Sequence, residues 1–119
     1  MGTVRDHVAP WTSVYKIHLL TDTDVTFVLT SGGHNAGIVS EPGHPGRSYQ
    51  IATKRESDMH VDPETWHAAT PKHEGSWWPE WVSWLQRQSS GKVQPPPLGA
   101  PEKGYPALED ASGRYVLQP

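Results

Sequence analysis

The residues from Val25 to His34 read VTFVLTSGGH. The first six are β-branched or apolar almost without interruption, a pattern typical of a strand buried on both faces of a parallel sheet. Gly32 and Gly33 then end the strand and allow the backbone to turn sharply. We therefore expect a strand over residues 25–30 that brings His34 to the loop just beyond its carboxyl end.

The residues before this strand predict its first neighbours. Thr3 and Val4 resemble the end of another strand, because Asp6 and a turn containing Pro10 follow at once. Residues 10–20 (PWTSVYKIHLL) place apolar side chains three and four positions apart, and proline suits the first position of a helix. Strand, helix and strand within about 30 residues form a βαβ unit with a parallel sheet. The fold class expected is α/β.

The second half of the chain has weaker patterns. Residues 41–47 are rich in turn formers, and residues 49–53 suggest a short extended piece. A second helix is expected in SWWPEWVSWLQRQSSG (76–91), with Ser76 as its N-cap and Gly91 at its end. Residues 92–119 contain the run PPP (95–97) and further prolines and glycines, so we expect an extended tail that lies on a surface or is disordered. The predicted division is thus 1–91 and 92–119.

Composition limits the classes of function. The chain has 119 residues, 34% of them hydrophobic, and a net charge of −3, which allows one small domain and gives no basic stripe for nucleic acid. No apolar run approaches the roughly 20 residues of a membrane span, and the N-terminus lacks a signal peptide. A cytoplasmic protein is expected. With no cysteine, the chain has neither disulfides nor a thiolate of its own.

Two polar residues lie where an α/β sheet collects reactive groups. Asp6 and His34 each follow a predicted strand, and the carboxyl ends of neighbouring parallel strands meet at one edge. A carboxylate that orients an imidazole is part of a nucleophile-His-Asp triad. In this interpretation, the small residues Ala36 and Gly37 keep the far side of the loop open to a substrate. The alternative is structural, since a histidine after glycines is often only a loop residue and an aspartate after a strand is often a turn or cap. Spacing leaves both interpretations open.

Other candidates are weaker. His7, beside Asp6, is more simply a residue at the entry to the helix. No metal site is expected, because four further histidines lack the short spacing of metal ligands; they are His44, His60, His67 and His73.

The four tryptophans of residues 77–84 allow two interpretations. They form either a face that packs in a core or an amphipathic surface that contacts a hydrophobic particle outside the protein.

Three motifs in order resemble one enzyme family. They are DHVAPW (6–11), TSGGHNAGIV (30–39) and EGSWWPEW (74–81). Together they are similar to the C-terminal part of the polyhydroxyalkanoate synthases, also called poly(3-hydroxybutyrate) polymerases, over roughly residues 4–88. The resemblance implies the last part of an α/β-hydrolase fold, as strand, helix, strand and helix with a Pro-rich irregular tail.

The resemblance also implies a site. The family's catalytic aspartate and histidine fall on Asp6 and His34. In the family, a cysteine in a G-x-C-x-G turn attacks the thioester of a 3-hydroxyacyl-CoA, the histidine acts as base, and the acyl unit joins a polyester as CoA leaves. The resemblance implies no cofactor or metal beyond this substrate. Chemically this is consistent, because a thiol needs a neighbouring imidazole to become a nucleophile.

The chain departs from the family at the nucleophile. It has no cysteine and no G-x-S-x-G turn. We therefore expect a C-terminal fragment that is inactive and only marginally stable alone, with its buried strand paired only to residues 3–4. Its expected partners are an upstream synthase segment or the surface of a polyester granule. The alternative is a non-enzymatic interaction module derived from the synthase C-terminus and associated with granules.

Overall fold

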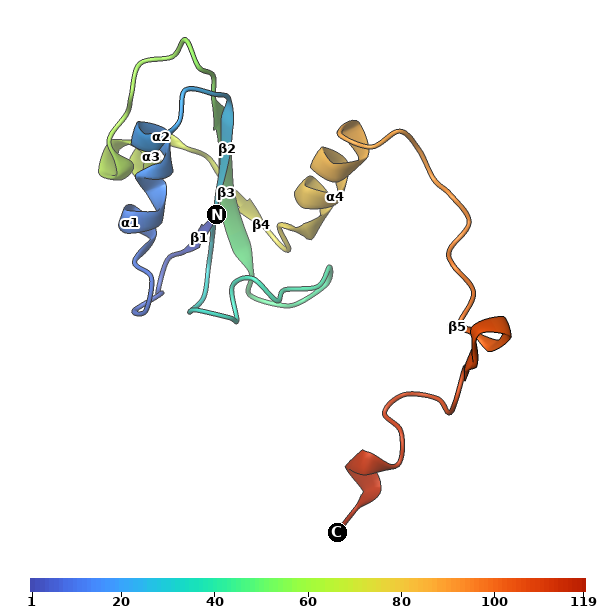
Figure 1. The fold of residues 1–119 in the computed structure, drawn as a ribbon. Coiled ribbons are helices and arrows are strands. Elements are labelled where there is room, and N and C mark those ends of the chain that lie inside the picture. Colours follow the sequence, from blue (N-terminus) through green and yellow to red (C-terminus); the bar gives the residue numbers. More distant parts are fainter. The chain divides into compact units, whose positions relative to one another are not determined.

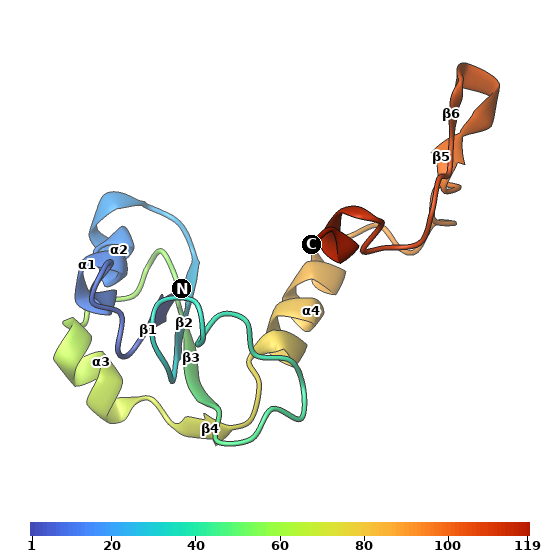
Figure 2. The ribbon, with the colours of Figure 1, turned by 90° about the horizontal axis from the view of Figure 1, so that it is seen from below.

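A computed structural model describes all residues, 1–119. The chain forms two compact units, Met1–Ser89 and Ser90–Pro119. The first unit is a mixed α/β structure in which a four-stranded sheet has three helices on one face and a fourth on the other (Figures 1 and 2). In chain order its elements are β1 (Gly2–Thr3), α1 (Trp11–Tyr15), α2 (Ile17–Leu20), β2 (Val25–Thr30), β3 (Ser48–Lys54), α3 (Pro63–Ala69), β4 (Lys72–Glu74) and α4 (Trp78–Arg87).

Strand β2 lies inside the sheet, whose order is β1-β2-β3-β4. The prediction of a strand over 25–30 is confirmed, and so is its parallel pairing with the first residues of the chain, Thr3 with Thr30. The expectation that β2 pairs only with residues 3–4 is wrong. All six of its residues also pair antiparallel with β3, so the sheet is mixed and β2 is satisfied on both edges.

An aromatic core fills the space between the sheet and the helices α1, α2 and α3. Phe27 is fully buried and packs edge-on against Tyr15 at 5.1 Å and Trp66 at 5.4 Å between ring centroids. Leu29, two residues along β2, points to the same face and is 1% exposed. The predicted helix over 10–20 is present as two short helices that meet at Lys16.

Helix α3 was not predicted from the sequence. Asp62 caps it by accepting a hydrogen bond from the Thr65 amide at 2.9 Å, and Pro63 occupies its first turn. The helix contributes Trp66 to the core. Strand β4 then pairs with β3. The predicted order of strand, helix, strand and helix therefore omits α3 and β4, and the extended piece predicted over residues 49–53 is the strand β3.

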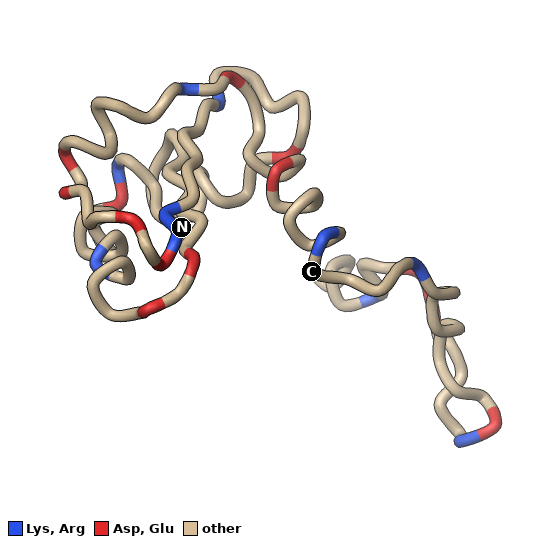
Figure 3. The backbone as a smooth tube through the Cα atoms, turned by 90° about the horizontal axis from the view of Figure 1, so that it is seen from above, with Lys and Arg blue, Asp and Glu red and all other residues tan.

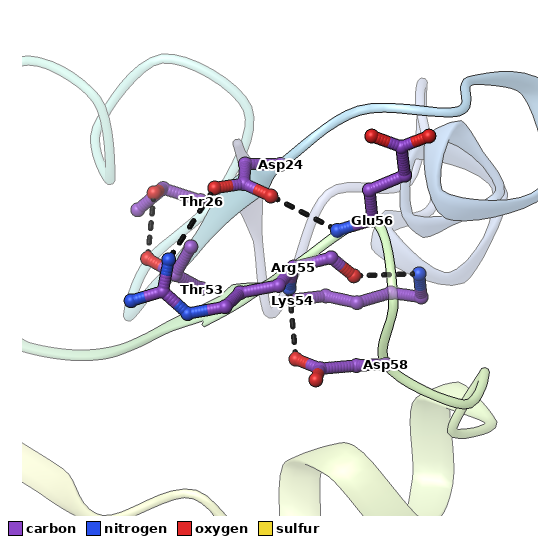
Figure 4. Close-up of polar contacts among 7 residues, drawn as sticks. All are labelled: Asp24, Thr26, Thr53, Lys54, Arg55, Glu56 and Asp58. Carbon is purple, nitrogen blue, oxygen red and sulfur yellow. Dashed lines mark hydrogen bonds and ion pairs between the residues drawn. The ribbon is translucent and has the colours of Figure 1, made fainter.

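Polar contacts fix the register of β2 and β3 at the end of the sheet far from His34 (Figure 4). Asp24 accepts a hydrogen bond from the Glu56 amide at 2.9 Å and lies 3.7 Å from the Arg55 guanidinium. Next to them, the hydroxyls of Thr26 and Thr53 are 2.7 Å apart. The segments before β2 and after β3 are thereby joined.

Helix α4 lies on the side of the sheet opposite to the other helices (Figures 1 and 2). It begins at Trp78, one residue later than an N-cap at Ser76 predicts, and ends at Arg87, before the predicted Gly91. Ser76 Oγ nevertheless accepts a hydrogen bond from the Trp78 amide. Between α4 and the sheet lies an apolar groove of about 470 Å³. Its walls include Val28, Ile51 and the partly exposed Trp81 and Trp84.

The second unit is mostly irregular, as its proline content predicts, but it contains regular pieces. Strands β5 (Gly99–Ala100) and β6 (Tyr105–Pro106) form a small antiparallel hairpin around the 3₁₀ turn Pro101–Lys103, and a second 3₁₀ turn spans Tyr115–Leu117. Acidic and basic residues are scattered along the backbone of both units (Figure 3). None of the helices has both the length and the apolar character of a membrane-spanning segment.

The core can be tested by a pair of leucine substitutions. Leu29→Ala is expected to lower the free energy of unfolding by about 2–5 kcal/mol, because it leaves a cavity under the aromatic cluster. Leu19→Ala, at a side chain that is 63% exposed, is expected to change it by about 0.5 kcal/mol or less. Urea unfolding followed by tryptophan fluorescence measures both. Equal effects of the two substitutions would contradict the placement of the core.

Candidate active site

The parallel pairing of β1 with β2 brings Asp6 to His34. The pairing continues past the strand ends, where the Val4 amide donates to the Thr30 carbonyl and the Arg5 amide to the Gly32 carbonyl, both at 2.9 Å. Asp6 follows directly. Its Oδ2 atom lies 2.9 Å from His34 Nδ1, so the two predicted site residues are in direct contact.

The Asp6 carboxylate is held rigidly from the other side. Its Oδ1 atom accepts hydrogen bonds from the amides of Val8 and Ala9, both at 2.9 Å. The Asp6 side chain is only 8% exposed, whereas the His34 side chain is 48% exposed. One carboxylate oxygen is thus fixed by the backbone, and the other is directed at the imidazole.

These contacts determine the charge of Asp6 and the tautomer of His34. The amide of Ala9, followed by the hydrogen bond from His34, lowers the pKa of Asp6 from 3.8 to about 2. An ionised carboxylate can only accept, so His34 must carry its proton on Nδ1. The Nε2 lone pair of the neutral ring is then free to take a proton.

The glycines near His34 have two different roles. Gly32 has a φ of +109°, as expected for a sharp turn. Gly37, expected to keep space open for a substrate, instead packs tightly, since a Cβ there would come within 2.6 Å of Thr30 Oγ1. That expectation is wrong, and the loop from His34 to Ser40 rests directly on the strand ends through Gly37.

A second histidine forms a similar pair in a different environment. His44 Nδ1 lies 3.0 Å from Glu41 Oε1, three residues before it in the turn-rich loop. Glu41 is 59% exposed, however, and belongs to no strand end. This pair is a natural control for the chemistry of Asp6 and His34.

The other histidines are scattered. His7 is exposed and makes no side-chain hydrogen bond. His60 lies near Tyr15, His67 near Trp11, and His73 stacks on Tyr49. No three residues among the histidines, aspartates and glutamates gather where they could hold a metal ion.

Two further features adjoin the pair. A cavity of about 350 Å³ lies on the α3 side of the strand ends and is lined by Arg5, Gly32 and Lys72 among others. On the α4 side, the side chains of Ser76, Trp77 and Trp78 contact the loop that begins at His34. The sequence singled out this Ser-Trp-Trp segment, but its contact with the loop was not predicted.

No family model matches the chain. The chain is 38% identical over 113 residues to poly(3-hydroxyalkanoate) polymerase 2 of Ectopseudomonas oleovorans, a match that covers 95% of this chain and 19% of the relative. It is 36% identical over 115 residues to the poly(3-hydroxyalkanoate) polymerase subunit PhaC of Cupriavidus necator, covering 97% and 19%. A polymerase of Methylorubrum extorquens is 38% identical over 117 residues, covering 98% and 18%. The chain therefore spans about a fifth of the length of these relatives.

The lowered pKa of Asp6 predicts a specific dependence of stability on pH. Since its pKa is about 2 in the folded chain and 3.8 ordinarily, ionised Asp6 stabilises the fold fully above about pH 4, and this contribution is lost as the pH falls toward 2. Urea unfolding of the wild type and of Asp6→Asn measures it. The stability difference between the two is expected to shrink as the pH falls from 4 to 2, and a constant difference would contradict the assignment.

Proposed function

The chain belongs to the poly(3-hydroxyalkanoate) polymerase family, and we propose that it contributes the base and the orienting carboxylate of an acyl-transfer site whose nucleophile lies on another segment. The observation that carries this proposal is the 2.9 Å contact between Asp6 Oδ2 and His34 Nδ1. It directs the second nitrogen of an exposed imidazole away from the carboxylate. On this proposal, the first unit is part of an α/β-hydrolase domain.

In the proposed reaction, His34 Nε2 removes the proton from a cysteine thiol, and the thiolate attacks the thioester of a 3-hydroxyacyl-CoA. CoA leaves as its thiol, taking the proton from His34, and the acyl group is bound to the cysteine. The neutral His34 then takes the proton from the hydroxyl of the next monomer or growing chain, which attacks the acyl-cysteine and extends the polyester, and the departing cysteine takes this proton back as its thiol. Asp6 stabilises the imidazolium formed in each step and holds the ring in its Nδ1–H tautomer.

The chain has no cysteine, so on this proposal it is inactive alone. No serine substitutes, because none lies in a G-x-S-x-G turn. The thiol must therefore be supplied by another segment, either in the same polypeptide or in a partner chain. Zero turnover by the isolated chain is expected and tests only this part of the proposal.

Complementation tests the proposed function directly. The chain is mixed with the remaining segment of a related polymerase that contains the cysteine, and CoA release from 3-hydroxybutyryl-CoA is followed. We expect turnover that His34→Ala lowers by about 10²–10⁴-fold, the usual contribution of a general base. Asp6→Asn is expected to lower it as well, because Asn no longer fixes the tautomer.

His44→Ala is the matched control, since it removes the imidazole of the similar pair whose carboxylate, Glu41, is exposed. It is expected to leave turnover unchanged. The proposed function would be wrong if a reconstituted, active mixture kept its rate with His34→Ala.

A second candidate function is supported by the apolar groove beside α4. Trp81 and Trp84 are 47% and 42% exposed and line, together with Val28 and Ile51, this apolar groove. Exposed apolar patches rimmed by polar residues often bind partners. The corresponding proposal is a non-enzymatic module that binds the surface of polyester granules.

Granule partition tests this second candidate. The wild type and a Trp81→Ala, Trp84→Ala variant are mixed with washed polyester granules and sedimented. The module hypothesis predicts that the variant shifts to the supernatant, while Tyr105→Ala, a substitution in the second unit at a 73% exposed side chain, stays with the granules. Equal sedimentation of all three proteins would rule the hypothesis out.

A further inference from the structure

Three consecutive side chains donate hydrogen bonds to the far end of the loop that starts at His34. Trp77 Nε1 donates to the Ile38 carbonyl at 3.0 Å, and Trp78 Nε1 donates to the same oxygen at 2.9 Å. Ser76 Oγ donates to the Ser40 carbonyl. All three bonds end on backbone oxygens of the segment 38–40, four to six residues after the histidine.

The geometry of this contact leaves little freedom. A carbonyl oxygen has two lone pairs, and the Ile38 oxygen uses both on indole N–H groups. Trp77 is 7% exposed and stacks on Trp81 at 5.4 Å between ring centroids, so its ring cannot turn to another acceptor. Ser76 Oγ also accepts from the Trp78 amide at 3.1 Å, which ties the start of α4 to the same loop.

The residues between His34 and this contact form a stiff unit. The Gly37 amide donates to the Gly33 carbonyl at 3.2 Å, and the amides of Ile38 and Val39 both donate to the Asn35 carbonyl, at 3.0 and 2.9 Å. Gly37 itself sits against Thr30 without room for a Cβ. A displacement of Ile38 is therefore passed back to His34.

The two members of the pair are anchored differently. Asp6 is fixed by the amides of Val8 and Ala9 and does not need the loop. The His34 side chain is about half exposed, and Asp6 is the sole side chain that it hydrogen-bonds. The position of its ring consequently depends on the backbone of its own loop.

We propose that Ser76, Trp77 and Trp78 act as positioning residues, a clasp that holds the loop 34–40 so that the His34 imidazole stays in line with Asp6. The clasp acts through the loop and touches neither member of the pair. The effect of this clasp on catalysis rests on the proposed function. Its effect on the position of the His34 ring does not. Errors of about 1 Å in a catalytic group cost as much as 10²-fold in rate, so such a clasp would matter for the reaction.

The test removes the two indole N–H groups and keeps aromatic rings. In the full 119-residue chain carrying Trp77→Phe and Trp78→Phe, long-range ¹H–¹⁵N spectra at alkaline pH report the tautomer of His34, and a carboxyl ¹³C titration reports the pKa of Asp6. We expect the Nδ1–H fraction of His34 to fall and the pKa of Asp6 to rise above about 2, while the amides of Ala9 and Val8 still keep this pKa below 3.8. Trp84→Phe, which removes an indole that donates no hydrogen bond, is expected to change neither.

The proposal is overturned if the double variant melts cooperatively, as judged by circular dichroism, and still has the wild-type tautomer and Asp6 pKa. Should the double variant fail to fold, Ser76→Ala replaces it, because it removes the Ser40 anchor with a small change in volume. It is expected to shift both readouts in the same direction, and unchanged readouts in folded Ser76→Ala overturn the proposal. Neither readout uses substrate, so a failure of complementation leaves this test intact.

Discussion

The pairing of two residues of β1 with the last two of β2 determines where every other part of the candidate site lies. Gly2 pairs with Leu29 and Thr3 with Thr30, and the pairing is parallel. Both strands therefore end at the same edge, and the next backbone bonds carry Asp6 to the turn at Gly32. An antiparallel arrangement, or a register shifted by one residue, would turn these side chains to the other face or the other end of the sheet.

The sequence predicts the parts of the fold that depend on local pattern and misses those that depend on tertiary pairing. β2 is predicted to the residue because a continuous β-branched run is typical of an inner strand. β3 mixes polar and apolar residues and is stabilised chiefly by pairing with β2, so the sequence showed only a short extended piece. Helix α3 could have been found, since Asp62 and Pro63 are a capping pattern before Trp66.

The same distinction applies to the site. The contact of Asp6 with His34 follows from strand ends and could be predicted, and the hydrogen bonds from the amides of Val8 and Ala9 are those expected of an aspartate that forms a turn or cap after a strand. The contact of Trp77 and Trp78 with Ile38, in contrast, could not be predicted. It joins segments about 40 residues apart through a backbone oxygen, and backbone acceptors are the same at every position of a sequence.

The asymmetry of the pair also limits how a nucleophile can reach it. Asp6 is nearly buried and occupies Nδ1, the loop 34–40 is pressed onto the strand ends through Gly37, and α4 closes the far side of that loop. A nucleophile can therefore reach His34 Nε2 only from the solvent-exposed side of the ring. A thiol that is to lose its proton to this ring must come within about 2.6–3.2 Å of Nε2. Any segment that supplies it must therefore lie over the carboxyl edge of β1 and β2, where it would also cover the exposed half of the imidazole and remove it from water.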